Sequence, residues 1–110
     1  MKINKATIVQ SLNGVKIELY KTKNLLSITI DTYKVENIDS LIQKKFLLKC
    51  DEFKMDITGE QMFKKCETEN YTLSLGFGKW YPFSILSETE ESNRFIEEIF
   101  EWLQTIDIPT

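Results

Sequence analysis

The sequence predicts an α+β fold, in which a curved antiparallel sheet of five to seven strands is packed by a C-terminal amphipathic helix. Three observations favour this fold. An Asn-Gly pair separates two alternating polar–apolar runs near the N-terminus, a further alternating run covers 71–77, and residues 95–106 repeat apolar side chains with helical spacing. The chain has 110 residues, the usual size of one domain, so residues 1–110 are expected to form a single globular unit.

The Asn13-Gly14 pair is the clearest local signal for a hairpin. Asn-Gly favours a two-residue type I′ turn, because both central residues of that turn need a positive φ. Such a turn pairs Leu12 with Val15 and continues in that register away from the turn. A polar break follows at 21–24, and alternation then resumes. The first 31 residues are therefore predicted to form a three-stranded meander.

The stretch from 38 to 49 leaves two alternatives open. Ile38, Leu41, Ile42 and Phe46 fit one face of a helix, with Asn37 or Asp39 as a possible N-cap. The alternative is a hairpin of two strands, at 46–50 and 53–57, because apolar and polar residues alternate in both segments.

Three further elements are expected between this stretch and the C-terminal helix. The tetrapeptide at 58–61, Thr-Gly-Glu-Gln, resembles a capping box and predicts a short helix over 58–67. The run at 71–77 is the cleanest strand pattern in the chain, since every second residue is apolar. A last strand over 81–85 is expected at an edge of the sheet, or bulged, because Pro82 cannot donate a backbone hydrogen bond.

The C-terminal helix has the strongest signal. Residues 87–90 read Ser-Glu-Thr-Glu, a capping-box pattern whose acids favour the positive end of the helix dipole. Apolar residues then recur at i, i+3, i+4 and i+7 from Phe95 to Ile106, and Trp102 widens that face. Such a broad apolar face is unstable in water, so the helix is expected to lie on the sheet.

A curved sheet capped by a C-terminal helix that carries a Trp is similar to the pleckstrin-homology-like architecture. Trp102 provides the Trp here, and the resemblance concerns topology alone. It implies a module that binds an anionic ligand or a phosphate head group, with Lys16, Lys21 and Lys23 as the candidate anion-binding residues. A helix over 58–67 does not belong to this layout.

Composition limits the possible chemistry. The chain has no His, which excludes Ser-His-Asp and Cys-His catalysis and every metal site that uses imidazole. No nucleophile–base pair and no ligand cluster can be named, so we expect no enzyme activity, no metal and no other cofactor. The Gly-Phe-Gly-Lys run at 76–79 lacks the spacing of a phosphate loop and is interpreted as a turn or bulge.

Charge is divided unevenly along the chain. Residues 1–50 contain nine Lys and four acids, a net charge of +5, whereas residues 51–110 contain five basic residues and thirteen acids, a net charge of −8; the total is −3. Only one of the fourteen basic residues is Arg, so sequence-specific DNA recognition is not expected. Weak RNA binding through the basic half remains an alternative.

Cys50 and Cys66 are not part of a C-x-x-C motif, and we expect them to be free, buried thiols. The apolar run near the N-terminus is too short for a signal peptide or a membrane span. These features predict a cytoplasmic protein, and the scarcity of Arg beside abundant Lys, Ile and Asn suggests a bacterial or phage source.

Two surface features are candidate contact sites. Trp80 and Tyr81 are neighbours on a strand and point to opposite faces, so one of them is expected to be exposed. The acidic side of the C-terminal helix suits a partner with a basic surface, with Glu97, Glu98 and Glu101 as contact residues. The leading interpretation is a non-catalytic protein-binding module, a small bacterial or phage inhibitor such as a toxin-neutralising immunity protein or an anti-defence protein.

Overall fold

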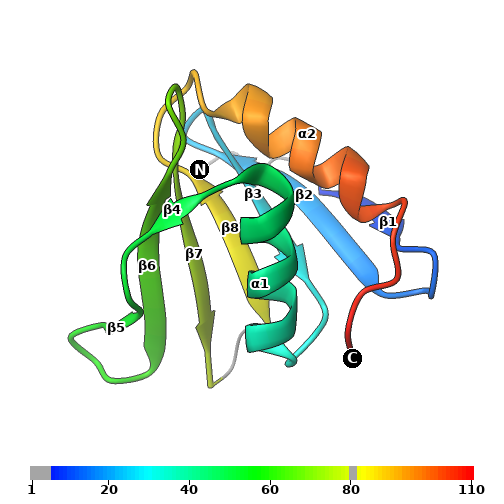
Figure 1. Ribbon diagram of the computed structural model, residues 1–110, viewed down its shortest axis with the longest axis horizontal. Coiled ribbons are helices and arrows are strands. Elements are labelled where there is room, and N and C mark those ends of the chain that lie inside the picture. Colours follow the sequence, from blue (N-terminus) through cyan, green and yellow to red (C-terminus); the bar gives the residue numbers. More distant parts are fainter. Residues whose placement is uncertain (1–5, 80–81) are drawn as a thin grey trace.

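The computed structural model describes residues 6–79 and 82–110, which form an open antiparallel sheet with two helices on one face (Figure 1). The predicted α+β class, with its antiparallel sheet and C-terminal helix, is confirmed. In chain order, the elements are β1 (Thr7–Gln10), β2 (Lys16–Thr22), β3 (Leu25–Ile30), α1 (Val35–Phe46), β4 (Lys49–Cys50), β5 (Lys54–Met55), β6 (Gln61–Glu67), β7 (Thr72–Gly78), β8 (Phe83–Ser87) and α2 (Asn93–Leu103).

The strands lie in the order β1-β2-β3-β8-β7-β6-β4, and β5 pairs with β6 beside β4. The described residues thus contribute eight strands, two of them only two residues long, where five to seven were expected. The C-terminal helix carries Trp102, the sheet is not closed, and the mid-chain helix α1 is an element that is not part of the expected layout. No helix in the described ranges is long and apolar enough to cross a membrane.

The last strand joins the two halves of the sheet. β8 lies between β3 and β7, with Ile30 opposite Phe83 and Ile28 opposite Ile85. The expectation that this strand forms an edge is therefore wrong. Pro82 precedes the first paired residue of β8, so its missing N–H removes no hydrogen bond from the ladder.

The core lies between the helices and one face of the sheet, which we call the helix-side face. The central strands alternate, so every second residue points into this core. The fully buried side chains include Ile17, Ile28, Ile30, Leu73, Leu75, Phe83 and Ile85 of the sheet, and Ile38, Ile42, Ile96, Ile99 and Leu103 of the helices. Burial of each such side chain is worth about 1.5–3 kcal/mol, which explains why α2 packs on β2, β3 and β8 as predicted.

The first hairpin forms, but its register differs from the predicted one by one residue. Gln10 pairs with Lys16, and the loop closes through a 2.9 Å hydrogen bond from Ser11 N to Val15 O. The loop therefore has three residues, with only the last, Gly14, at a positive φ of 84°. A shift of one residue exchanges the two faces of a strand, and it leaves the Ile8 side chain 59% exposed.

The C-terminal tail decides this register through Asn13. The Asn13 side chain donates a hydrogen bond to Ile108 O at 2.8 Å and accepts one from Ile108 N at 2.9 Å. Leu12 N also donates to Ile106 O at 3.0 Å, so the loop and the tail pair like two strands. Ile108 is 1% exposed, and these bonds satisfy the backbone of a buried residue.

We expect Asn13→Ala to lower the free energy of unfolding by about 2 kcal/mol, because it leaves the buried Ile108 N–H and C=O without partners. Urea denaturation followed by circular dichroism measures the change. The matched control is Leu12→Ala, which truncates an exposed side chain in the same loop and should change stability by less than about 0.5 kcal/mol. Equal losses in the two variants would contradict the assignment.

A type I′ turn occurs in the second hairpin instead. Lys23 and Asn24 have φ values of 50° and 69°, and Thr22 pairs with Leu25 across them. The start of α2 is bound to this turn, since Asn93 accepts a hydrogen bond from Leu26 N at 2.9 Å and donates one to Asn24 O at 2.8 Å.

The helical alternative for the mid-chain stretch is confirmed by α1, and the hairpin alternative is wrong because β4 and β5 both pair with β6. The predicted caps are also wrong. The N-cap of α1 is Lys34, which makes no side-chain capping bond. Asp39 lies inside the helix, and its carboxylate accepts a hydrogen bond from Lys64 of β6.

The predicted helix over 58–67 is a strand, β6, preceded by a tight turn. Asp56 holds this turn by accepting hydrogen bonds from the Thr58 hydroxyl at 2.8 Å and from Glu60 N at 3.2 Å. The bond from Thr58 is the main reason why the pKa of the Asp56 carboxyl lies below its ordinary value. The capping-box pattern thus stabilises a turn, with Gly59 at a φ of 75°.

The start of α2 also differs from the predicted capping box at 87–90. Ser87 ends β8, and the helix begins at Asn93 with Ser92 as its N-cap. Ser92 Oγ makes no capping bond within the helix and instead accepts a hydrogen bond from Thr72 N at 2.9 Å. The pattern therefore places the helix one to two turns too early.

Candidate functional site

The side of α2 away from the sheet carries three exposed carboxylates, Glu97, Glu98 and Glu101, which we call the acidic face. Glu101 is three residues after Glu98 and four after Glu97, so it neighbours both on the helix surface. The ion pairs between described residues, Lys16–Glu18 and Lys64–Asp39, lie elsewhere. Among residues 6–79 and 82–110, no ion pair involves these three carboxylates, and the basic residue of α2, Arg94, lies one turn before Glu97 and Glu98.

The other predicted contact residues, Trp80 and Tyr81, lie outside the described residues. Lys79 and Pro82 flank them in sequence, at the end of β7 and the beginning of β8. Figure 1 shows this end of both strands at the bottom of the view, whereas α2 crosses the top. The end of β7 and the beginning of β8 thus lie away from α2.

The three lysines predicted for anion binding do not gather around one point. Lys16 begins β2 and Lys21 lies near its end, roughly 16 Å away at 3.3 Å per residue. Lys23 lies in the turn beyond. The Lys16 ammonium is also 3.4 Å from the Glu18 carboxylate. One phosphate group cannot contact all three side chains in this arrangement.

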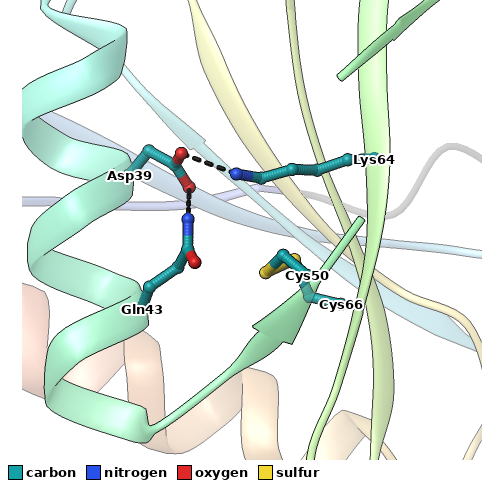
Figure 2. Close-up of a disulfide and its surroundings, with 5 residues drawn as sticks. All are labelled: Asp39, Gln43, Cys50, Lys64 and Cys66. Atoms are coloured by element: carbon teal, nitrogen blue, oxygen red, sulfur yellow. Dashed lines mark hydrogen bonds and ion pairs between the residues drawn. A yellow bond between two sulfur atoms is a disulfide. The ribbon is translucent and has the colours of Figure 1, made fainter. Parts of the chain in front are cut away.

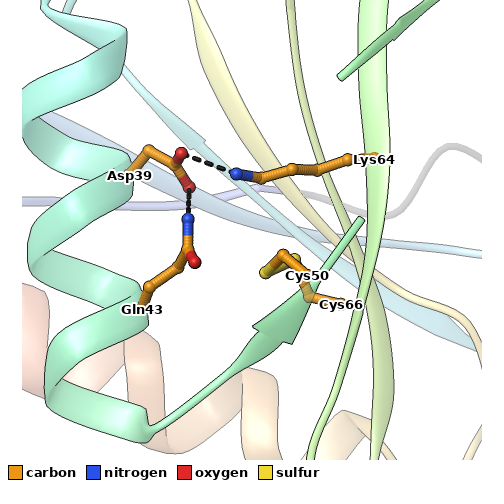
Figure 3. Close-up of polar contacts among 5 residues, drawn as sticks. All are labelled: Asp39, Gln43, Cys50, Lys64 and Cys66. Atoms are coloured by element: carbon orange, nitrogen blue, oxygen red, sulfur yellow. Dashed lines mark hydrogen bonds and ion pairs between the residues drawn. A yellow bond between two sulfur atoms is a disulfide. The ribbon is translucent and has the colours of Figure 1, made fainter. Parts of the chain in front are cut away.

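A buried polar cluster joins α1 to β6 (Figure 3). Lys64 Nζ donates to Asp39 Oδ2 at 2.6 Å, and Gln43 Nε2 donates to Asp39 Oδ1 at 3.0 Å. The same ammonium lies 4.3 Å from the centre of the Phe53 ring. Lys64 is only 6% exposed, so both charges are largely removed from water.

This cluster is best explained as a structural contact that holds helix α1 against the sheet. Every buried side-chain nitrogen and oxygen atom in the described residues has a hydrogen-bond partner. Lys64 occupies a helix-side position on β6, where an apolar residue is usual. The ion pair lies on the side of α1 where Ile38 and Ile42 are also buried.

Beside the cluster, Cys50 and Cys66 form a disulfide with an S–S distance of 2.02 Å (Figure 2). They are directly opposite each other in β4 and β6. The expectation of free thiols is therefore wrong, because the sheet brings together two residues that are sixteen apart in sequence. The expectation of free thiols follows from the lack of a secretion signal, whereas disulfides are typical of oxidising compartments.

The opposite face of the sheet, which we call the outer face, carries an open groove of about 420 Å³. Tyr20 of β2 and Phe63 of β6 bound it, and Leu86 of β8 stands between them. Its floor consists of small residues, Ser74, Gly76 and Ser84. Phe63 and Leu86 are 42% and 40% exposed, so both present apolar surface to the groove.

Glu88 is the one charged residue that lines this groove within the described ranges. It follows β8, and its backbone N–H donates to Thr72 O at 3.1 Å. The Ser74 hydroxyl donates a hydrogen bond to Glu88 Oε1, and Ser74 is only 9% exposed. The backbone and a buried side chain thus both restrict where this carboxylate lies.

Comparisons with known protein families, with characterised proteins and with solved structures find no match to this chain. Function therefore has to be inferred from the geometry. Within the described ranges, no group of three or more His, Cys, Asp or Glu side chains is placed to hold a metal ion.

The sequence contains a partial signal for the groove. In the run at 71–78, the residues that alternate with the apolar ones are Thr, Ser, Gly and Gly, which are unusually small for a solvent-exposed strand face. That pattern indicates a shallow face. It does not indicate the walls, because Tyr20, Phe63 and Leu86 come from three strands whose order depends on the β3–β8 pairing.

Proposed function

We propose that this protein is a non-catalytic protein-binding module that recognises a basic partner through the acidic face of α2. The observation that supports the proposal is the set of three exposed carboxylates that form no ion pair within the described residues. Their helix is held rigidly, because Phe95, Ile96 and Ile99 are buried on its other side. A preorganised charged surface loses little conformational entropy on binding and favours fast association with an oppositely charged protein.

A small protein with such a surface suits an inhibitor that covers a basic site on another protein. Toxin-neutralising immunity proteins and anti-defence proteins of bacteria and phages act in this way, and we place this chain among these two classes as a proposal. The proteins that such inhibitors neutralise include nucleases, whose substrate-binding surfaces are basic because they contact phosphates.

The test is a charge reversal. We expect the combined variant Glu97→Lys, Glu98→Lys and Glu101→Lys to bind the partner at least about tenfold more weakly, because each reversed charge removes an attraction and adds a repulsion. The partner is first identified by capture from cells of the source, and its affinity for both proteins is then measured with purified components at two salt concentrations.

The matched control reverses three exposed acids elsewhere, Glu52→Lys, Glu60→Lys and Glu69→Lys, and produces the same net charge. This control should retain affinity to within about threefold, because screening at physiological salt weakens charges that lie outside the interface. Equal weakening in both variants would indicate a general charge effect and would contradict binding through α2, as would an unchanged affinity in the first variant.

A further inference from the structure

We propose that the groove on the outer face of the sheet binds an arginine side chain of the partner, presented next to an apolar residue. This inference rests on the proposed function, because it names what a second surface of the same module recognises in a basic protein partner. It concerns the face opposite to α2 and uses none of the residues of the acidic face.

The charge of the groove favours a cationic occupant. Glu88 is its one charged lining residue in the described part of the chain, and its carboxylate is oriented by the buried Ser74 hydroxyl. Lys65 lies opposite Ser74 on the same face, but it does not line the groove. A carboxylate that is already positioned can accept two parallel hydrogen bonds from a guanidinium group, which a Lys ammonium cannot donate in this geometry.

The walls of the groove favour arginine for a second reason. Tyr20 presents an aromatic ring to the same space, and guanidinium groups stack on aromatic faces. The exposed side chain of Leu86 provides apolar surface for the methylene stem. Phe63 lies two strands further along, so it suits a neighbouring apolar residue of an extended segment.

The floor leaves space for that segment. Ser74, Gly76 and Ser84 have small side chains or none, and the volume of about 420 Å³ falls within the range of ligand sites. A Cβ on Gly76 would lie only 3.3 Å from Met62 O, so a larger residue there would crowd the strand as well as the floor. The groove is therefore formed by the backbone pairing of β6, β7 and β8 and does not need to open.

The test uses two blocked dipeptides as probes, acetyl-Leu-Arg-amide and acetyl-Leu-citrulline-amide. Citrulline has the shape of arginine but carries no charge. In ¹H–¹⁵N spectra of the full chain, we expect saturable shifts of the Ser74, Gly76 and Ser84 amides with the arginine probe. The citrulline probe should bind about fivefold more weakly or worse, because it forms neither the ion pair nor the cation–π contact.

Variants locate the contact. Glu88→Gln keeps the acceptor for Ser74, and it should weaken the arginine probe by about fivefold without changing the binding of the citrulline probe. The control is Glu67→Gln, an exposed acid on the outer face that does not line the groove, and it should bind both probes as the unaltered protein does. If Glu88→Gln fails to fold, the comparison of the two probes on the unaltered protein still decides the question.

Three results would overturn the inference. The first is that the arginine probe causes no amide shifts, or shifts spread over the whole surface. The second is equal affinity for the two probes. The third is shifts that depend on protein concentration without a probe, which would show that a second copy of the chain covers the groove. The variant with three Lys on α2 should still bind the arginine probe in the groove. Loss of groove binding alone would therefore leave the proposed function intact, and loss of partner binding alone would leave the groove intact.

Discussion

Replacing Asp39 by Ala should lower the free energy of unfolding by about 3–5 kcal/mol, because the ammonium of Lys64 then remains buried without its carboxylate. The bond from Gln43 is lost in the same substitution. Few surface substitutions have effects of this size, so urea denaturation readily detects it. The cation–π contact with Phe53 persists, but it is too weak to replace an ion pair.

The control removes both charges at once, as Asp39→Leu with Lys64→Met. This double variant should lose less than half as much stability as Asp39→Ala, because well-packed apolar residues often replace a buried ion pair at little cost. If the double variant is as unstable as Asp39→Ala, the loss comes from packing. A loss below about 1 kcal/mol in Asp39→Ala would show that water reaches Lys64 and that the pair is exposed.

Reduction of the Cys50–Cys66 disulfide should lower the free energy of unfolding by about 3 kcal/mol, the value expected for a crosslink that closes a loop of roughly this length. The disulfide attaches β4, which has only two paired residues, to the edge of the sheet. We therefore expect hydrogen exchange at the edge to increase most. Denaturation with and without a dithiol reductant measures the change in stability.

The control is the variant Cys50→Ala with Cys66→Ala, whose stability should not respond to the reductant. Intact mass after alkylation provides a direct check, since the unreduced protein should take up no alkylating reagent and the reduced, unfolded protein should take up two groups per chain. Alkylation before reduction would contradict the disulfide, and a stability that does not respond to the reductant would contradict its structural role.

Prediction from sequence succeeds where one periodic pattern of apolar residues repeats several times within a short segment. The alternating run at β7 and the helical spacing of α2 each repeat over several turns or residue pairs, and both elements form. Prediction fails at β6, because Lys64 occupies an inward position and interrupts the alternation of polar and apolar residues. The capping-box pattern at the preceding turn then wrongly predicts a helix. A polar residue that is buried through a partner on another element cannot be recognised without that element.

The candidate sites divide in the same way. The acidic face of α2 follows from helical spacing alone, because a helix whose apolar side is buried must expose the other side. The small residues of β7 indicate the floor of the outer-face groove, but its walls could not be anticipated, since they belong to β2, β6 and β8. Trp80 and Tyr81 remain a prediction.

By itself, the sequence determines the α+β class, the C-terminal helix, the acidic face, and the absence of imidazole chemistry. Only the tertiary structure decides the register of the first hairpin, the central place of β8, the disulfide, the Asp39–Lys64 pair and the groove. The physical reason is the range of the interactions involved. Periodicity acts between residues a few positions apart, whereas each of these features depends on partners brought together from distant parts of the chain, such as Asn13 with Ile108 and Ile30 with Phe83.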